Sequence, residues 1–144
     1  MTRDARKIFN VSAGVLTRGG RILTCQRKAD DPHGLKWEFP GGKVMNGEES
    51  ATCLQRELKE ELGIDAVIGK ELWRDHHVYP DHTEVFLTFL HVPTYHGELR
   101  NLAFERILWV KPADLLSYDF LAGDLPFVQA LAQGRYEVLL NADH

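Results

Sequence analysis

The sequence is poor in cysteine, contains no long apolar run and shows no excess of positive charge. Its two cysteines, Cys25 and Cys53, lie far apart and outside any CxxC pair, so neither a disulfide framework nor a zinc ribbon is indicated. No run of about 18 apolar residues occurs, and the charged N-terminus lacks the apolar stretch of a signal peptide. We therefore expect a cytoplasmic protein that does not enter a membrane.

The balance of charge argues against a nucleic-acid-binding surface. The chain has 17 Lys and Arg residues against 21 Asp and Glu residues, which gives a net charge of -4. Binding to a nucleic-acid backbone is driven by many Lys and Arg side chains that displace counterions, so we expect no stable nucleic-acid partner. A small anionic ligand held together with metal ions is compatible with this composition. The length of 144 residues predicts a single domain, residues 1–144.

The spacing of apolar residues predicts a mixture of strands and helices. A hairpin is expected over residues 11–17 and 21–27, because Gly19-Gly20 supplies the positive φ angles of a tight turn. Further strands are expected around 37–39 and over 67–79, 84–92 and 106–110, and short helices over 112–117 and 125–133. The run 84–92 barely alternates, which is typical of a strand buried on both faces. Together these elements predict an α/β (α+β) fold, with a mixed sheet between helices.

A central helix is expected over residues 51–62, with Ser50 as its N-cap and Gly63 as its C-terminal stop. An apolar stripe on one face should pack on the sheet, and it consists of Ala51, Leu54, Leu58 and Leu62.

Beside this stripe, Glu57, Glu60 and Glu61 place three carboxylates on neighbouring positions of the helix. Clustered carboxylates suit a hard divalent cation, which would relieve their mutual repulsion. Taken alone, the pattern also fits a solvated, glutamate-rich helix face.

The spacing around these glutamates resembles the complete signature of the Nudix hydrolase family. Gly42 is followed after five residues by Glu48, and after seven more by Arg56-Glu57-Leu58-Lys59-Glu60-Glu61-Leu62-Gly63-Ile64. Residues 37–43 and 121–126 are also similar to segments of MutT-type enzymes, before this box and at the C-terminal base pocket. The resemblance is to the MutT-like and CTP pyrophosphohydrolase-like branch, and it implies a Nudix-type α/β/α sandwich with its box at residues 42–64.

The resemblance implies a divalent-metal centre, with Mg2+ as the ion and Mn2+ as a possible substitute. Its implied ligands are the carboxylates of Glu57, Glu60 and Glu61 and the backbone carbonyl of Gly41. Glu48 would be a supporting carboxylate that can touch metal-bound water, and Arg56 would orient the neighbouring glutamates. For Arg56 the alternative is an ordinary ion pair on the helix surface.

The general base is less well indicated by the resemblance. Many relatives place a glutamate six residues before the tryptophan that matches Trp109, but this chain has Ala103 there. Glu105 lies two residues away, so either a shifted loop brings Glu105 to the reacting water, or a box residue such as Glu61 or Glu48 takes the proton.

The resemblance also implies substrate contacts outside the helix. Arg27 would bind phosphate or sugar oxygens through its guanidinium fork, and Lys43, directly after Gly41-Gly42, would also bind substrate. Phe39 would line the base pocket, Asp124 would read the base edge, and His82 would contact the nucleotide. The alternatives are a surface arginine for Arg27, a core ring for Phe39 and a helix N-cap for Asp124.

The expected function is a Mg2+-dependent nucleoside triphosphate pyrophosphohydrolase that sanitises the nucleotide pool. The metal would neutralise phosphate oxygens and align an activated water with a phosphorus atom, giving a monophosphate and pyrophosphate. Candidate substrates are CTP, dCTP, 5-methyl-dCTP and 8-oxo-dGTP. The alternatives are hydrolysis of ADP-ribose or dinucleoside polyphosphates, removal of pyrophosphate from RNA 5′ ends, which the acidic charge disfavours, and a non-catalytic nucleotide sensor. The sequence leaves open whether the protein is a monomer or a homodimer.

Overall fold

The computed structural model describes residues 7–137 and Leu140. Within them, seven strands form one mixed sheet in the order β3-β2-β1-β7-β6, with β4 added to β1 and β9 added to β2. The strands are β1 (Ile8–Arg18), β2 (Arg21–Gln26), β3 (Trp37–Glu38), β4 (Gly41–Lys43), β6 (Glu71–Val78), β7 (Glu84–Val92) and β9 (Arg106–Val110). The β1–β7 pair is parallel, whereas the other pairs of this sheet are antiparallel. A small second sheet pairs β5 (Asp65–Val67) with β8 (Thr94–His96).

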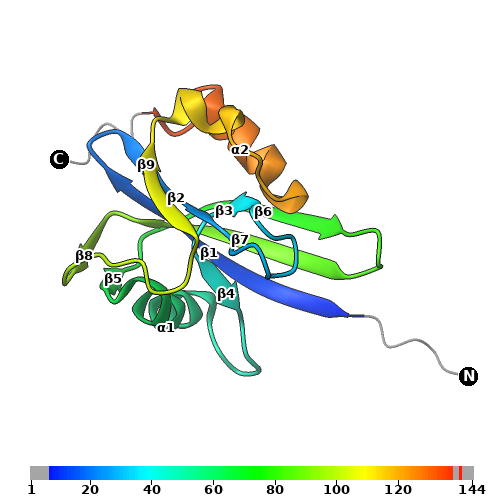
Figure 1. Ribbon diagram of the computed structural model, residues 1–144. Coiled ribbons are helices and arrows are strands. Elements are labelled where there is room, and N and C mark those ends of the chain that lie inside the picture. Colours follow the sequence, from blue (N-terminus) through cyan, green and yellow to red (C-terminus); the bar gives the residue numbers. More distant parts are fainter. Residues whose placement is uncertain (1–6, 138–139, 141–144) are drawn as a thin grey trace, which may run out of the picture.

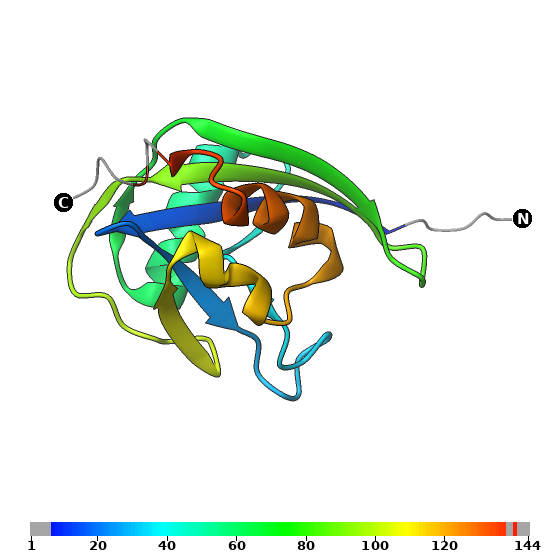
Figure 2. The same cartoon turned by 90° about the horizontal axis from the view of Figure 1, so that it is seen from above.

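Helices cover both faces of the sheet (Figures 1 and 2). One face packs against α1 (Ser50–Leu62), and the other packs against α2 (Leu125–Ala132) and the 3-10 helix η1 (Pro112–Ser117). A second 3-10 turn, η2 (Ala122–Asp124), leads directly into α2. The predicted α/β/α sandwich with a mixed sheet is therefore confirmed.

Alternating side chains on β7 divide the core into two clusters. Leu87 and Phe89 pack on the α2 side, whereas Leu90 and Val92 pack on the α1 side. This half of the strand is buried on both faces, as predicted. The prediction is wrong for the first half, where the side chain of Phe86 is 42% exposed, because neither helix extends over that end of the sheet.

The central helix α1 packs through the predicted apolar stripe, with Leu54, Leu58 and Leu62 fully buried. Gly63 ends the helix in the left-handed conformation, with φ of 70°, and its N–H donates to the Lys59 carbonyl. The predicted N-cap is wrong by one residue. Glu49 is the N-cap, because its backbone carbonyl accepts the first hydrogen bond of the helix, from the Cys53 N–H. Its side chain makes no cap hydrogen bond.

The predicted continuous strand over 67–79 is wrong, because the chain changes pairing partner. Val67 lies opposite Thr94 in the small sheet, whereas Glu71 lies opposite Leu90 in the main sheet. Between them, the Gly69 N–H donates to the carbonyl of His91. The partner change separates β5 from β6.

The predicted hairpin is confirmed, with Thr17 opposite Ile22 on either side of Gly19-Gly20. The short strand β4 was not predicted, because glycine has a low strand propensity. Gly41 lies opposite Ala13 and Gly42 opposite Ser12, which fixes the glycine pair against β1. No helix among the described residues is long and apolar enough to cross a membrane.

Candidate active site

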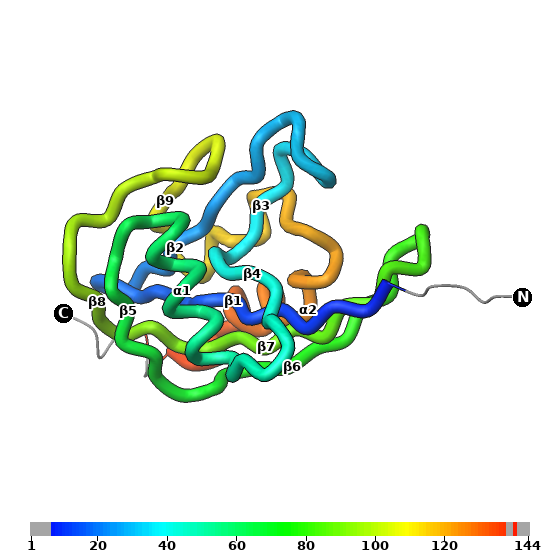
Figure 3. The backbone as a smooth tube through the Cα atoms, turned by 90° about the horizontal axis from the view of Figure 1, so that it is seen from below, coloured from blue at the N-terminus to red at the C-terminus, as the bar shows by residue number. Residues whose placement is uncertain are grey.

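A cavity of about 530 Å³ opens on the α2 side of the sheet, over the part of that face that α2 does not cover. Phe9, Val11 and Ala13 of β1 form its floor together with Val85 and Leu87 of β7. They share one face because side chains two residues apart on a strand point the same way. Figure 3 shows α1 and β4 beside β1, where the glutamate-bearing helix meets the glycine pair. Of the predicted metal ligands, Gly41 and Glu61 line this cavity, and Phe39 and Asp124 of the predicted base pocket line it as well, whereas Glu57 and Glu60 do not.

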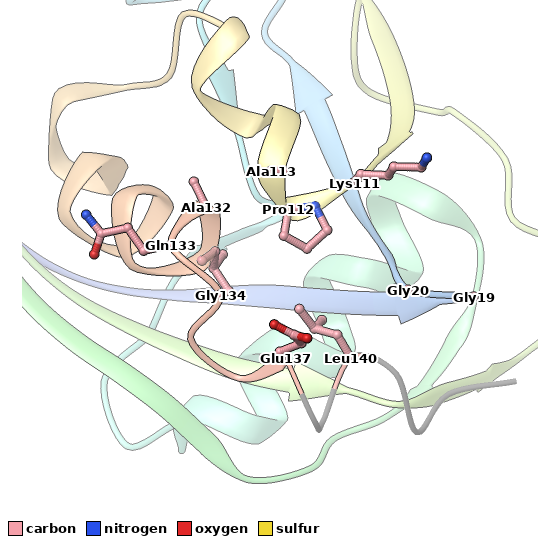
Figure 4. A pocket seen from close by; sticks show the side chains of 11 residues that line it. Gly19, Gly20, Lys111, Pro112, Ala113, Ala132, Gln133, Gly134, Glu137 and Leu140 are labelled. Atoms are coloured by element: carbon pink, nitrogen blue, oxygen red, sulfur yellow. The ribbon is translucent and has the colours of Figure 1, made fainter.

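A second cavity of about 550 Å³ lies at the other end of β1, near the Gly19-Gly20 turn (Figure 4). Its described lining contains two ionisable side chains, Lys111 and Glu137. The first cavity brings together several, namely Lys7, Arg27, His33, Glu38, Lys43, Glu61, Tyr79, Asp81 and Asp124. Its chemistry marks the first cavity as the candidate active site.

The α1 end of the cavity is shaped by the two glycines of β4. A Cβ on Gly41 would lie 2.0 Å from the Ser12 carbonyl oxygen, and a Cβ on Gly42 would lie 2.4 Å from the Glu57 carboxylate carbon. The Gly41 N–H donates to Oε1 of Glu61 at 3.1 Å. The bare backbone of the glycine pair therefore gives both carboxylates room beside β4.

Glu61 is a largely buried carboxyl group. Burial, followed by the charges of Glu57 and Glu38, raises the pKa of Glu61 to about 9. Two carboxyls in such proximity repel when both are ionised, and a divalent cation between them removes that repulsion. This donor set of carboxylate oxygens fits a hard divalent ion.

Arg56 holds three of the neighbouring glutamates. Its Nε and Nη2 donate to both oxygens of Glu48, at 3.0 and 2.9 Å, and its Nη1 donates to Glu57 at 2.6 Å and to Glu60 at 3.5 Å. Hydrogen bonds from Arg56, with one from the Met45 N–H, lower the pKa of Glu48 to about 2. Arg56 therefore binds three glutamates at once, whereas an ordinary surface ion pair would join it to one.

Among the described residues, no three His, Cys, Asp or Glu side chains converge closely enough to hold a metal ion. The cause is visible in the contacts, since Glu57 and the exposed Glu60 are turned to Arg56. Side-chain rotation of Glu60, with a backbone that already places Glu57 beside Gly42 and Glu61 beside Gly41, would complete an all-oxygen ligand set.

At the α2 end of the cavity, Asp124 is buried, with 5% of the residue exposed. Burial raises the pKa of Asp124 well above its usual value, and the charge of Glu38 adds to the rise. Asp124 precedes α2 at the N-cap position but makes no side-chain cap hydrogen bond there. The interpretation as an ordinary side-chain N-cap is therefore wrong, and the carboxyl group lines the cavity instead.

Replacing Asp124 with asparagine is expected to make the free energy of unfolding less dependent on pH. Because the folded state raises the pKa of Asp124, its stabilising contribution is full below the unfolded-state pKa of about 3.9 and is lost as the pH rises toward the folded value. The advantage of the variant over the wild type should therefore grow from pH 4 to pH 8 in urea titrations. Asp30→Asn, at an exposed loop position, is the control, and a constant difference for Asp124→Asn would contradict the assignment.

Arg27 lines the cavity, and its guanidinium group hydrogen-bonds to other residues of the protein. Its Nη1 donates to Glu38 at 3.0 Å and its Nε donates to the Pro32 carbonyl at 2.8 Å. Glu38 was not among the predicted site residues, although a charged residue between the aromatic residues Trp37 and Phe39 is a signal in the sequence. Its pKa is raised by burial, with Arg27 opposing the rise.

Phe39 serves mainly as a core residue. It is 4% exposed, and its ring contacts those of Phe89, Phe120 and Phe127 at centroid distances of 5.4 to 5.8 Å. It also borders the cavity, so the core interpretation and the predicted wall are both compatible with its place.

His82 and Tyr79 lie on the same turn, and only Tyr79 is brought to the cavity. His82 is exposed with φ of 70°, and it is absent from the cavity lining, which includes its neighbours Asp81 and Thr83. Tyr79 lines the cavity and its ring lies 5.0 Å from that of His33, another lining residue. The sequence did not indicate that Tyr79 and His33 line the cavity, because the loop that carries His33 and the turn that carries Tyr79 come together only in the folded protein.

Glu105 is not among the cavity-lining residues. It is exposed just before β9, and its N–H donates to the Gln26 carbonyl. The loop before it is tied to the end of α1, since the Leu102 N–H donates to the backbone carbonyl of Glu61. The role of Glu105 as general base stays a prediction.

Known proteins are similar to this chain in sequence and in fold. A family model described as the NUDIX domain matches residues 8–131. The chain is 36% identical over 124 residues to a CTP pyrophosphohydrolase of Escherichia coli (strain K12), covering 86% of this chain and 91% of the relative. It is 35% identical over 140 residues to an 8-oxo-dGTP diphosphatase of Haemophilus influenzae, covering 96% of each.

A solved structure from a study of MutT from Aliivibrio salmonicida and Vibrio cholerae superposes with a TM-score of 0.74. It is 29% identical in sequence, and the match covers 88% of this chain and 98% of that one. The family match spans both ends of the cavity, from the floor on β1 to α2. With its complete box, its sandwich fold and these relatives, the chain belongs to the Nudix family, in the MutT-like branch.

Proposed function

We propose that this protein is a Mg2+-dependent nucleoside triphosphate pyrophosphohydrolase that removes damaged or surplus nucleotides. The observation that carries the proposal is a single cavity with two chemically different ends, one at Glu61 of α1 and the other at buried Asp124, directly before α2. A nucleoside triphosphate has the same layout, with anionic phosphates at one end and a hydrogen-bonding base at the other. A volume of about 530 Å³ is typical of small-molecule sites.

Nudix hydrolases generally use a divalent metal ion, and we propose Mg2+ here, with Mn2+ as a substitute. When bound, the ion supplies charge neutralisation at the phosphates and a lowered pKa for water. Glu57, Glu60 and Glu61, with the Gly41 carbonyl, would hold it. Arg56 would hold Glu57 in place through its hydrogen bond while Glu60 rotates toward the ion, and Glu48 stays ionised as the main partner of Arg56.

Asp124 would read the base. Because burial raises its pKa, the carboxyl group keeps its proton more readily and can then donate one hydrogen bond while accepting another. Cytosine presents such a pair, an acceptor nitrogen next to a donor amino group. CTP, dCTP and 5-methyl-dCTP carry this pair, and 8-oxo-dGTP joins them as a candidate substrate because the names of the relatives cover both the cytosine and the oxidised guanine classes.

The test is turnover of a nucleotide panel with Mg2+, measuring monophosphate and pyrophosphate separately. We expect one of the four triphosphates to give equal amounts of both products, and chelation of Mg2+ to abolish the reaction. Glu60→Gln should lower the rate by about 100-fold, the size typical of a lost charged contact in a metal centre. Glu49→Gln, an exposed carboxylate just before α1, is the control.

Other outcomes identify other functions. Faster turnover of ADP-ribose or diadenosine polyphosphates would assign a different substrate class to the same metal centre. Nucleotide binding that persists without any turnover would support the sensor interpretation. The described cavity is lined by one chain, so both a monomer and a homodimer are compatible with activity.

A further inference from the structure

Lys43 is held over an aromatic ring at the cavity floor. Its Nζ lies 3.9 Å from the centroid of the Phe9 ring, and both residues line the cavity. The contact follows from strand register, because Lys43 on β4 lies opposite Val11 on β1, and Phe9 is the diagonal neighbour two residues away. Diagonal neighbours across a strand pair are within reach of long side chains.

The ring contact is notable because carboxylates are abundant at this end of the cavity. Arg56, and not Lys43, is paired with Glu48, Glu57 and Glu60. Within the described part of the chain, Lys43 makes no ion pair. An aromatic face attracts an ammonium group without neutralising its charge. The charge of Lys43 is thus fixed in place and is still available to an anionic ligand.

We propose that Phe9 is a positioning residue that holds the Lys43 ammonium over the cavity floor, where it binds the phosphate chain of the substrate. This inference rests on the proposed function, because the anion that Lys43 meets is the polyphosphate. Phe9 touches no reacting atom and acts only through Lys43. The position of Lys43 directly after Gly41-Gly42 places it at the phosphate end of the cavity.

A double-mutant cycle on kcat/KM tests this coupling. Phe9→Leu should lower kcat/KM by about 3- to 10-fold, mostly through KM, which is the size of a lost cation–π contact. Phe9→Tyr keeps the aromatic face and should restore the wild-type value. In a Lys43→Met background, Phe9→Leu should have no further effect. Phe86→Leu, which removes an exposed ring outside the cavity lining, is the control and should leave kcat/KM unchanged.

A readout independent of turnover separates this proposal from the proposed function. In NMR spectra the ε-methylene protons of Lys43 should show an upfield ring-current shift that Phe9→Leu removes. Inorganic triphosphate with Mg2+ should move these signals, with an apparent Kd about 3- to 10-fold higher in Phe9→Leu. An enzyme without NTP turnover but with these NMR results would overturn the proposed function and keep the Phe9 assignment. The Phe9 assignment would be overturned if Phe9→Leu lowered kcat/KM as much in the Lys43→Met background as in the wild type. An unshifted Lys43 signal in the wild-type NMR spectrum would also overturn it.

Discussion

Replacing Glu61 with glutamine is expected to lower kcat by about 1,000-fold while the protein stays folded. The carboxylate lies beside Gly41 and Glu57 at the phosphate end of the cavity, so the substitution removes one charged ligand from the proposed metal centre. A 1,000-fold loss corresponds to about 4 kcal/mol, within the range expected for a lost stabilisation of transition-state charge. Steady-state kinetics with Mg2+ at saturating nucleotide measure it.

The same substitution should stabilise the metal-free protein at neutral and alkaline pH. Since the folded state raises the pKa of Glu61 to about 9, its stabilising contribution is full below the unfolded-state pKa of about 4.3 and is lost as the pH rises through about 9. With chelator present, the Tm of Glu61→Gln should therefore exceed that of the wild type increasingly from pH 5 to pH 9. Added Mg2+ should raise the Tm of the wild type alone.

Glu49→Gln is the matched control for this experiment, because it removes an exposed carboxylate that makes no side-chain cap contact. It should change neither kcat nor the pH dependence of the Tm. Full activity of Glu61→Gln would contradict the proposed metal centre. Loss of activity together with a lowered Tm in chelator would indicate that Glu61 is needed for folding.

Replacing Gly42 with alanine is expected to lower kcat/KM by about 100-fold with only a small loss of stability. The new Cβ would lie 2.4 Å from the carboxylate of Glu57, which must move. Moving the end of a flexible side chain costs little folding free energy, whereas misplacing a metal ligand or a group that orients one costs about 100-fold in activity. Kinetics and urea unfolding of the same preparation measure both effects.

Two other glycines bracket this prediction. Gly47→Ala strains a residue with φ of 78° but meets no atom within 4 Å, so it should cost about 1 kcal/mol of stability and no activity. Gly41→Ala would bring a Cβ within 2.0 Å of the Ser12 carbonyl oxygen, a backbone atom, and should unfold the protein or strongly destabilise it. If Gly42→Ala retains the wild-type kcat/KM, the inferred place of Glu57 is wrong.

The features that the sequence predicted well are those encoded locally. The period of the apolar residues predicted α1, and the conformational freedom of glycine predicted its end at Gly63. The spacing of the glutamates on the helix, together with the resemblance to a known family, predicted the acidic end of the cavity. Burial of Asp124 in the cavity agrees with its predicted place at the base pocket, although its contact with substrate stays a prediction.

The features that the sequence did not predict depend on contacts between distant segments. The break between β5 and β6 arises from a change of pairing partner, and Gly69 at the break does not by itself identify the new partner. The hydrogen bonds between Arg56 and Glu48 form only because the loop before α1 folds back against the helix. The meeting of His33 with Tyr79, and of Lys43 with Phe9, likewise follows from the tertiary fold and not from spacing.

The most direct test of the account is to map Mn2+ and a non-hydrolysable CTP analogue on the protein in one complex by NMR. Paramagnetic broadening should centre on the amides of Gly41, Gly42 and Glu61, and the base should give nuclear Overhauser contacts to the amides of Phe39 and Asp124. Both sets of signals, seen together, would support a single cavity with a phosphate end and a base end. Broadening away from α1, or base contacts at the cavity near Gly19 and Gly20, would contradict it (Figure 4).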